Sequence, residues 1–413
     1  MSSSIKKILV FSLLAAMVGG TFSGCKKNSS KPSSEAESAG KNVKLVVWGS
    51  QDDQKMLGEM VESFKKENSK NTYDITLKVV GEDIASGEVK KDISAAADVF
   101  AIAHDQLRDL VSTGAVYQNT KYADEIKNSV TEEAVRASTS DGKLYGYPFA
   151  QNTYFLYYDK RIFNEEDVKS LDTMLAKTVP NGVDKFGLDF ANGYFNSSFF
   201  LTNGCTLFGP DGTDETQVSF NNEGGLAAAK YIATLHKKGA VSLSDDEAGA
   251  VFVSGKLGAY VGGDWKTATF KEKLGENYAV AELPFIELGS EKKHMKSFSG
   301  CKLYCVNAQT KSPTEAMALA NYLTTEKNQE KRFKDRLLLP ANKKVLESDQ
   351  LKSDPTTKAH RAQLSHSIPM SSNKKVDKFW GVMKALGSDL FNGKVPESDM
   401  QKKLDEGVSD IKS

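Results

Sequence analysis

The chain has 413 residues, and its 54 lysines and arginines balance its 54 aspartates and glutamates. This balance gives no sign of a nucleic-acid partner, and none is expected. Hydrophobic residues make up 39% of the chain, which suits a soluble globular body. Residues 43–413 exceed what one hydrophobic core usually organises, so we predict two domains.

The first residues differ in kind from the rest. Lys6 and Lys7 precede an apolar run over 8–18, which is too short to span a bilayer comfortably and is typical of a secretory signal. The small residues before Cys25 resemble a bacterial lipobox. That resemblance implies removal of residues 1–24 and acylation of Cys25, as by palmitate; a plain secretory signal with a chance cysteine is the alternative.

Residues 25–42 are expected to be the lipidated cysteine and a flexible tether. The segment 26–42 has no aromatic and no large aliphatic residue, so it cannot bury enough apolar surface to offset its ordering entropy. Two acyl chains on one cysteine would suffice for stable anchoring. The folded part is therefore expected at the extracellular face of the bacterial cell membrane.

The folded part opens with the pattern of an α/β lobe. A β-rich run over 44–48 precedes residues 55–67, whose apolar positions recur at helical spacing. Residues 73–79 alternate between apolar and polar, and 98–103 form a continuous apolar run, as in a strand buried on both faces. This order predicts a largely parallel sheet.

A second group of elements follows. Ser312 and Pro313 predict the start of one helix, with Ser312 as its cap and Glu315 completing a capping box. The other expected elements are extended runs over 146–150 and 154–158, a helix over 226–235, a strand over 257–261 and a helix from 374 onward.

Three cysteines remain in the folded part. Cys301 and Cys305 lie on one expected strand, where four residues span about 13 Å, too far for a disulfide. Cys205 could pair with one of them only if the fold brings them together. We expect three free and mostly buried thiols.

Catalytic signatures are absent from the sequence, which has no nucleophile elbow, no P-loop and no HExxH motif. None of the five histidines is spaced with another histidine or a cysteine as metal ligands usually are, so no metal and no cofactor are expected. The acidic runs at 52–53 and 245–247 give no separation across a scissile bond. Such runs usually form solvated faces.

Four aromatic residues are the better clue to function: Trp48, Tyr194, Trp265 and Trp380. Flat aromatic rings suit the apolar C–H faces of sugars, although the alternative for each ring alone is packing in the core. The Gly262-Gly263-Asp264 run before Trp265 favours a turn with some exposure, which favours a binding role for that residue.

Asp52 and Asp105 each follow the carboxyl end of a predicted strand. In open α/β sheets ligands bind at that edge. An aspartate in such a place can equally cap the next helix. On the residues alone, both interpretations stay open.

In the order and spacing of its motifs, the chain resembles the maltose-binding protein family, the extracellular solute-binding proteins of ATP-binding-cassette importers. The resemblance covers nearly all of residues 43–413. It rests on the helix opening at Ser312 and on these motifs: Lys44-Leu45-Val46-Val47-Trp48, Ala103-His104-Asp105, Ser112-Thr113-Gly114-Ala115-Val116, Asp141-Gly142-Lys143-Leu144-Tyr145-Gly146-Tyr147-Pro148-Phe149-Ala150, Tyr157-Tyr158-Asp159-Lys160, Gly193-Tyr194-Phe195, Gly262-Gly263-Asp264-Trp265 and Phe379-Trp380.

The resemblance implies an α/β, two-lobed, periplasmic-binding-protein-like fold with a hinge and an interlobe ligand cleft. Lobe one would comprise residues 43–151 plus 303–338, and lobe two residues 152–302 plus 339–413. Each lobe would thus be assembled from discontinuous parts of the chain, and the lobes would close on the ligand.

The resemblance also implies contacts to a bound sugar. Asp52 and Asp105 would bond sugar hydroxyls from lobe one. The rings that would stack on the sugar from lobe two are Tyr194, Trp265 and Trp380. Asn152 and Asn192 match positions where the family has acids that contact sugar, and an amide can still hydrogen-bond hydroxyls.

The chain departs from the family pattern mainly at the rim of lobe one. Ile102 stands in place of a stacking tryptophan, and Gln106 replaces a basic sugar contact. Gly381 replaces a tyrosine next to Trp380. The three aromatic residues of lobe two are kept, so the departures leave open which sugar is bound and how long it is.

The expected function is capture of maltose or malto-oligosaccharides, without catalysis, by a lipid-anchored monomer that serves the permease subunits of an importer. Binding of another oligosaccharide is the first alternative. The second is an anchored extracellular glycosidase, which needs two carboxylates about 5–9.5 Å apart across the site. The third is a surface adhesin or structural lipoprotein, which would lack a deep cleft between lobes.

Overall fold

The computed structural model describes residues 40–209, 212–289 and 291–413. The predicted signal over 1–24, Cys25 and nearly all of the predicted tether lie outside the described residues. Residues Lys41–Ser413 form one compact unit. Its first strand begins at Asn42, the last residue of the predicted tether. Among these residues no helix is both long and apolar enough to cross a bilayer.

The first half of the unit is built as its sequence pattern predicted. Strand β1 (Asn42–Gly49) pairs in parallel with β2 (Thr72–Val79) on one side and with β3 (Val99–Ala103) on the other. Helix α1 (Gln54–Glu67) connects β1 to β2 and buries the five apolar residues that recur at helical spacing. A parallel pair needs such a crossover helix.

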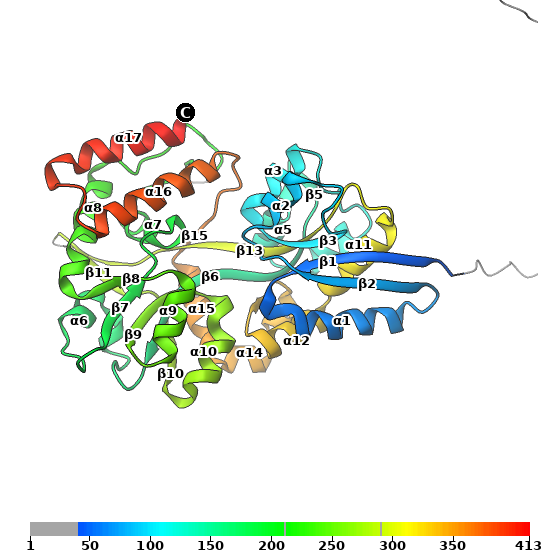
Figure 1. Ribbon diagram of the computed structural model, residues 1–413, viewed down its shortest axis with the longest axis horizontal. Helices are drawn as coiled ribbons and strands as arrows, with labels where there is room; N and C mark the ends of the chain where they lie inside the picture. The colour runs from blue at the N-terminus through cyan, green and yellow to red at the C-terminus, as the bar shows by residue number, and fades with distance from the viewer. Residues whose placement is uncertain (1–39, 210–211, 290) are drawn as a thin grey trace, which may run out of the picture. The chain divides into compact units, whose positions relative to one another are not determined.

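Two long strands run through the middle of the unit. Strand β6 (Tyr147–Asp159) pairs antiparallel with β13 (Ser297–Val306), and β13 also pairs antiparallel with β3. The two aromatic runs seen in the sequence are therefore one continuous strand. In Figure 1, β6 and β13 connect the elements around β1 and β2 with those around β7 and β9.

The other half continues the same sheet. Strand β9 (Leu257–Gly263) pairs antiparallel with β6, whereas β9, β7 (Asp184–Leu188) and β8 (Ala240–Ser242) are parallel to one another. Strand β10 (Tyr278–Ala281) pairs with the other edge of β6. Helix α7 (Gly193–Thr202) packs against β13, and α16 (Val376–Phe391) packs against α7 and α8 (Glu223–Leu235). Helix α17 (Met400–Lys412) packs against α16 and α8.

The remaining elements complete the described chain. The helices are α2 (Ala85–Lys91), α3 (Leu107–Ser112), α4 (Ala123–Ser129), α5 (Glu132–Ala137), α6 (Leu171–Ala176), α9 (Asp245–Val253), α10 (Thr267–Leu274), α11 (Pro313–Leu323), α12 (Glu326–Arg336), α13 (Lys343–Leu346), α14 (Asp349–Ser353) and α15 (Pro355–Ser365). The strands are β4 (Thr139–Ser140), β5 (Lys143–Leu144), β11 (Phe285–Leu288), β12 (Glu291–His294), β14 (Leu339–Pro340) and β15 (Ser367–Pro369). Single 3₁₀ turns are η1 (Gln51–Asp53), η2 (His104–Gln106), η3 (Asp167–Lys169), η4 (His236–Lys238), η5 (Asp264–Lys266), η6 (Gly275–Asn277) and η7 (Glu397–Asp399).

The predicted capping box at α11 is wrong. Pro313 is the first helical residue and Ser312 the N-cap, but the Ser312 side chain makes no capping hydrogen bond. The carboxylate of Glu315 instead lies 3.2 Å from the ammonium group of Lys41. The sequence thus predicted the start of the helix correctly. The capping box does not form, and Glu315 pairs with the distant Lys41 instead.

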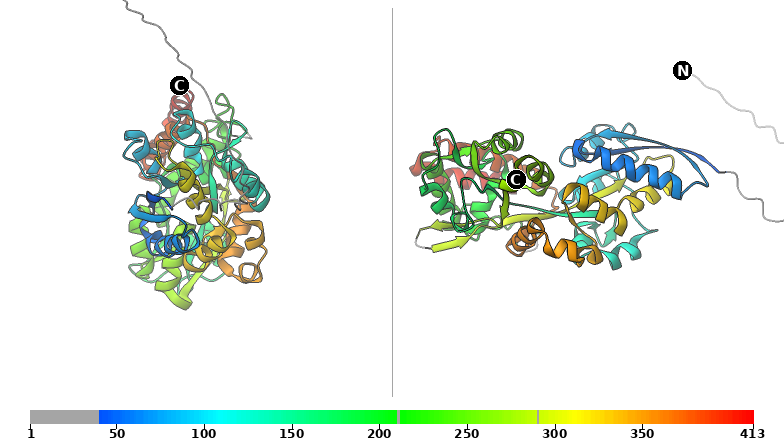
Figure 2. Two further views of the ribbon diagram at one scale, coloured as in Figure 1. Left: turned by 90° about the vertical axis from the view of Figure 1, so that its right-hand side faces the viewer. Right: turned by 90° about the horizontal axis from the view of Figure 1, so that it is seen from below.

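Two large hydrophobic clusters form the core. The first core gathers buried residues between 43 and 150, around 301–306 and from α11. The second core gathers residues between 154 and 298 and between 370 and 411. Both β6 and β13 contribute to each cluster. Figure 2 shows the two groups of elements from two further directions. The residue bounds given above for the two lobes stay a prediction.

All three cysteines of the described chain, Cys205, Cys301 and Cys305, are free and buried, as expected. Burial raises the pKa of the Cys205 thiol to about 12. These thiols are therefore protonated and unreactive near neutral pH.

Candidate functional site

A cavity of about 950 Å³ lies between the turns that end strands of the first half and the aromatic residues of the second half. This volume is near the upper end of the range of about 300–1,000 Å³ for ligand sites. Seven of the eight predicted sugar contacts line it: Asp52, Asp105, Asn152, Asn192, Tyr194, Trp265 and Trp380.

Three aromatic side chains meet on one side of the cavity. Tyr194 is on α7, Trp265 is in η5 and Trp380 is on α16. The Tyr194 ring centroid lies 6.4 Å from that of Trp265 and 6.4 Å from that of Trp380, with interplanar angles of 33° and 70°. All three residues are partly buried, so each combines packing against the second core with a surface toward the cavity.

The local sequence explains how the Trp265 ring is held. A Cβ atom on Gly263 would lie 2.1 Å from the ring, so only glycine at the end of β9 lets the ring fold back over it. The indole N–H of Trp265 donates to Asp245 at 2.9 Å, and the Tyr260 hydroxyl donates to the same carboxylate at 2.5 Å. The Lys302 ammonium lies 5.4 Å from the ring centroid.

An ion-pair network lines the side of the cavity opposite the aromatic residues, which the first half forms. Buried Asp53 accepts hydrogen bonds from Arg332 at 2.5 Å and from Arg336 at 3.0 Å. Burial by itself raises the pKa of Asp53, but the two guanidinium groups outweigh it and hold that pKa below its usual value. Arg336 also donates to Asp52 at 3.0 Å and to the main-chain oxygen of Trp265 at 3.4 Å. The network thus connects the end of β1 with the aromatic side.

Asp105 lies in η2, just beyond β3. Its Oδ1 atom is buried and has no hydrogen-bond partner among the described residues. Burial raises the pKa of Asp105 to about 6; the nearby Asp377 adds to this effect, whereas backbone N–H groups and the Trp380 side chain oppose it. The helix-capping alternative fails for Asp105 and also for Asp52, because no side-chain cap occurs at η1, α1, η2 or α3.

The two asparagines have different surroundings. Asn152 is buried on β6, and its Oδ1 atom has no hydrogen-bond partner among the described residues. Asn192 is the N-cap of α7, where its Oδ1 accepts from the backbone N–H of Tyr194 at 3.0 Å. One lone pair of the Asn192 oxygen is therefore used by the helix, and the second lone pair and the NH₂ group remain for a ligand.

Trp48 does not line the cavity. It is only 8% exposed and packs in the first core with its ring centroid 6.3 Å from that of Phe100. It sits at the end of a buried strand, one residue before the chain turns toward the rim. Its aromatic type indicated a sugar contact, but the strand directs the ring into the core.

Gln106 and Ile102 are two positions that depart from the family pattern. They lie on the side of the cavity that the first half forms. The Gln106 side chain donates to the main-chain oxygens of Glu82 and Asp83 at 2.8 and 3.2 Å, and accepts from the backbone N–H of Ser86. Ile102 is fully buried. Gln106 therefore fixes the loop before α2, which also lines the cavity.

Several cavity residues escaped the sequence analysis, notably Arg336, Lys302 and Asp245. Arg332 and Arg336 are four residues apart on α12 and share one face, which is a recognisable spacing. Phe333 is the only large apolar side chain within that helix, so the helix must bury other residue types against the core. The shared face of the two arginines was the signal in the sequence that could have indicated this. Asp245 was part of an acidic run that looked solvated; its neighbour Asp246 is fully exposed, as expected of such a run.

The sequence profile described as "Bacterial extracellular solute-binding protein" matches residues 59–359, which is more than half of the chain. The chain belongs to this family. This agrees with the resemblance drawn from the motifs.

Two curated relatives of this solute-binding protein come from Bacillus subtilis (strain 168). The galactooligosaccharide-binding protein is 28% identical over 98% of this chain and 97% of its own length. The maltodextrin-binding protein MdxE is 27% identical over 87% of each chain. Both cover nearly the full length, so the similarity is not confined to one segment.

Solved structures match the solute-binding protein as a whole. The maltodextrin-binding protein MalE1 from L. casei BL23, solved without ligand, is 28% identical with a TM-score of 0.79 and covers 90% of this chain and 99% of its own. A structure determined with acarbose is 32% identical with a TM-score of 0.84 over 90% and 98% of the two chains. The predicted two-lobed α/β fold is thereby confirmed.

Proposed function

We propose that this protein captures an oligosaccharide in the cavity and delivers it to an ATP-binding-cassette importer. The single observation that carries the proposal is the meeting of three aromatic rings with unpartnered polar atoms at one cavity. Aromatic faces suit the C–H faces of sugar rings, and buried polar atoms without protein partners are costly unless a ligand bonds them. These atoms are Asp105 Oδ1, Asn152 Oδ1 and the Tyr194 hydroxyl.

Malto-oligosaccharides are the first ligand class and galacto-oligosaccharides the second. Relatives named for maltodextrin, together with the similar structure determined with acarbose, support the first. The nearly full-length relative named for galactooligosaccharide supports the second. We expect the two sugar classes to be distinguished on the first half's side of the cavity, where Gln106 departs from the family pattern.

A binding role without catalysis is proposed. The relatives are binding proteins, and amides, Asn152 and Asn192, hold two of the candidate cavity positions. A glycosidase would need a free acid and a free base across the sugar. A structural lipoprotein would need no cavity of this volume. Release of product from a labelled oligosaccharide would restore the glycosidase alternative.

Closure of the two halves about β6 and β13 would couple sugar binding to docking on the permease. We further propose that the protein acts as a monomer, attached to the extracellular face of the membrane through acylated Cys25. The sequence before residue 26 supports the anchor. Metabolic labelling with palmitate tests it: the wild-type protein should be labelled, and label on Cys25→Ala would rule the anchor out.

Isothermal titration and thermal unfolding with a panel of sugars test the ligand class. We expect heat and a rise in Tm with maltose through maltopentaose or with β-galacto-oligosaccharides, and neither with an unrelated disaccharide such as trehalose. The better-bound series assigns the class. Absence of binding to both series would contradict the proposal.

Replacement of Asp105 should weaken sugar binding in a way that depends on pH. Asp105→Ala is expected to cost about 1.5–3 kcal/mol of binding free energy, the value of a charge-assisted hydrogen bond, and Asp105→Asn less because one acceptor oxygen remains. Since burial raises the pKa of Asp105 to about 6, protonation below that pH removes the charge, so wild-type affinity should fall between pH 7 and pH 5.

The Asp105→Asn variant is the control for that pH dependence. Buried Asp264, whose pKa is raised by burial to about 7, titrates in both proteins. The difference between the two pH profiles, measured by titration calorimetry, isolates Asp105. Identical profiles would show that Asp105 does not contact the sugar.

A further inference from the structure

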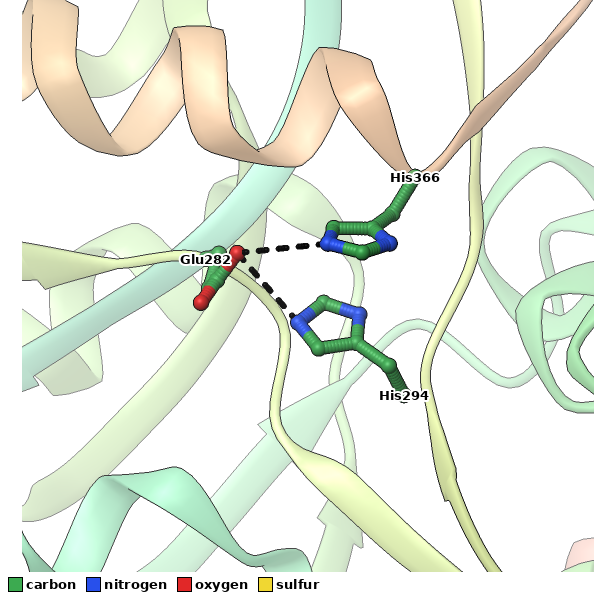
Figure 3. Close-up of side chains that lie close together, drawn as sticks. All are labelled: Glu282, His294 and His366. Atoms are coloured by element: carbon green, nitrogen blue, oxygen red, sulfur yellow. Dashed lines mark ion pairs between the residues drawn. The ribbon is translucent and has the colours of Figure 1, made fainter.

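Away from the cavity, three side chains from separate elements converge, although no spacing in the sequence indicated it. Glu282 follows β10, His294 ends β12, and His366 follows α15 (Figure 3). Their ligand atoms all lie within 4.8 Å of one another. Glu282 Oε2 is 3.3 Å from His294 Nε2 and 3.8 Å from His366 Nε2.

We propose that Glu282, His294 and His366 bind one divalent transition-metal ion of the Zn²⁺ class. Two imidazoles and one carboxylate are ligands that zinc uses when it keeps a further position open. With metal–ligand bonds of about 2.0–2.1 Å, neighbouring ligand atoms around a tetrahedral ion lie about 3.3 Å apart. The distance from Glu282 Oε2 to His294 Nε2 equals this value, and the distance to His366 Nε2 is 0.5 Å longer.

The surroundings of His294 already favour metal binding. Its Nδ1 lies 3.0 Å from the main-chain oxygen of Met295, so Nδ1–H donates there and leaves the lone pair on Nε2. This is the arrangement that holds a metal-ligating histidine in position. His294 Nε2 is buried and has no hydrogen-bond partner among the described residues, and it faces a carboxylate that also only accepts. A cation between these two acceptors satisfies both.

The second histidine supplies the adaptable ligand. The rings of His294 and His366 are stacked, with centroids 3.9 Å apart and an interplanar angle of 24°. His294 is mostly buried, whereas the side chains of His366 and Glu282 are 43% and 42% exposed. A small tilt of the exposed His366 ring directs both Nε2 lone pairs at one ion, and solvent can fill the open position.

Metal binding at this cluster would fix strands that lead to the middle of the molecule. His294 is three residues before β13, and His366 directly precedes β15, which pairs in parallel with the start of β13. An ion shared with Glu282 would cross-link the β11–β12 hairpin, α15 and β10. The expected consequence is stabilisation of the folded protein by zinc, independent of sugar.

The test is a Zn²⁺ titration of EDTA-treated protein that carries no polyhistidine tag, in competition with a chromophoric chelator. We expect one zinc ion per chain, a rise in Tm with zinc, and visible d–d absorption when Co²⁺ replaces it. His366→Gln and Glu282→Gln should each weaken zinc binding at least about tenfold. Their Tm in EDTA should be near that of the wild type, since both residues are half-exposed.

His236→Gln is the matched control, because His236 is exposed in η4 and is not among the residues whose ligand atoms converge. It should bind zinc like the wild type. Absence of zinc binding by the wild-type protein would overturn the proposal. Equal zinc affinity in the wild type, His366→Gln and Glu282→Gln would overturn it as well, by placing any bound zinc elsewhere.

Discussion

Replacement of Arg332 by methionine should lower the free energy of unfolding by about 3–5 kcal/mol, the usual cost of removing one partner from a buried ion pair. The guanidinium is 1% exposed, bonds Asp53 and the Tyr304 hydroxyl, and lies 4.2 Å from the Phe149 ring centroid. Methionine keeps much of the side-chain volume, and Arg336 remains beside Asp53, so the loss reports the broken Arg332–Asp53 pair rather than a cavity.

Lys331→Met on the same helix is the control. Lys331 is 30% exposed and pairs with Glu59 and Asp335 at the surface, where an ion pair contributes about 0–1 kcal/mol. Urea unfolding of both variants, followed by circular dichroism, makes the comparison. Equal midpoints for Arg332→Met and Lys331→Met would show that the Asp53 network does not stabilise the first half.

Trp265→Ala should weaken sugar binding by about 1–4 kcal/mol, as expected for a central aromatic contact. The ring lines the cavity, is held by Asp245 and lies beside Tyr194. Because Trp265 is only partly buried, the loss of stability should be small compared with the loss of affinity. Titration calorimetry and thermal unfolding measure the two effects on the same sample.

Trp48→Phe is the matched control, since Trp48 belongs to the first core and does not line the cavity. Its affinity for sugar should equal that of the wild type. If Trp265→Ala lowered Tm strongly and left affinity unchanged, Trp265 would be a core residue and its stacking role would be wrong.

Periodicity predicted the elements well because local patterns determine them. The helix over 55–67 and the alternating strand over 73–79 appear as α1 and β2 within one residue. Patterns could not show that 146–150 and 154–158 are one strand passing between two cores, since that depends on pairing with β13 far along the chain. For the same reason the cap of α11 was misjudged.

Site residues could be predicted where a short local motif determines their surroundings. They could not be predicted where the site depends on contacts between residues far apart in the sequence. Gly263 and Trp265 form a local unit, and its exposure was visible in the sequence. The ring direction of Trp48 depends on strand register. The buried pairing of Asp53 with α12, about 280 residues away, depends on tertiary contacts alone. So does the cluster of Glu282, His294 and His366, where no metal was expected.

A crystal structure of the protein with the sugar that binds best in the titration panel tests the central claim most directly. The account predicts sugar density between the halves of the molecule, with a ring against Trp265 or Trp380 and hydroxyls within hydrogen-bond distance of Asp105 and Asn152. A second cavity of about 520 Å³, lined by His104, Arg108 and Arg136 among others, offers a different location. Sugar bound there, with the aromatic cavity holding only water, would contradict the account.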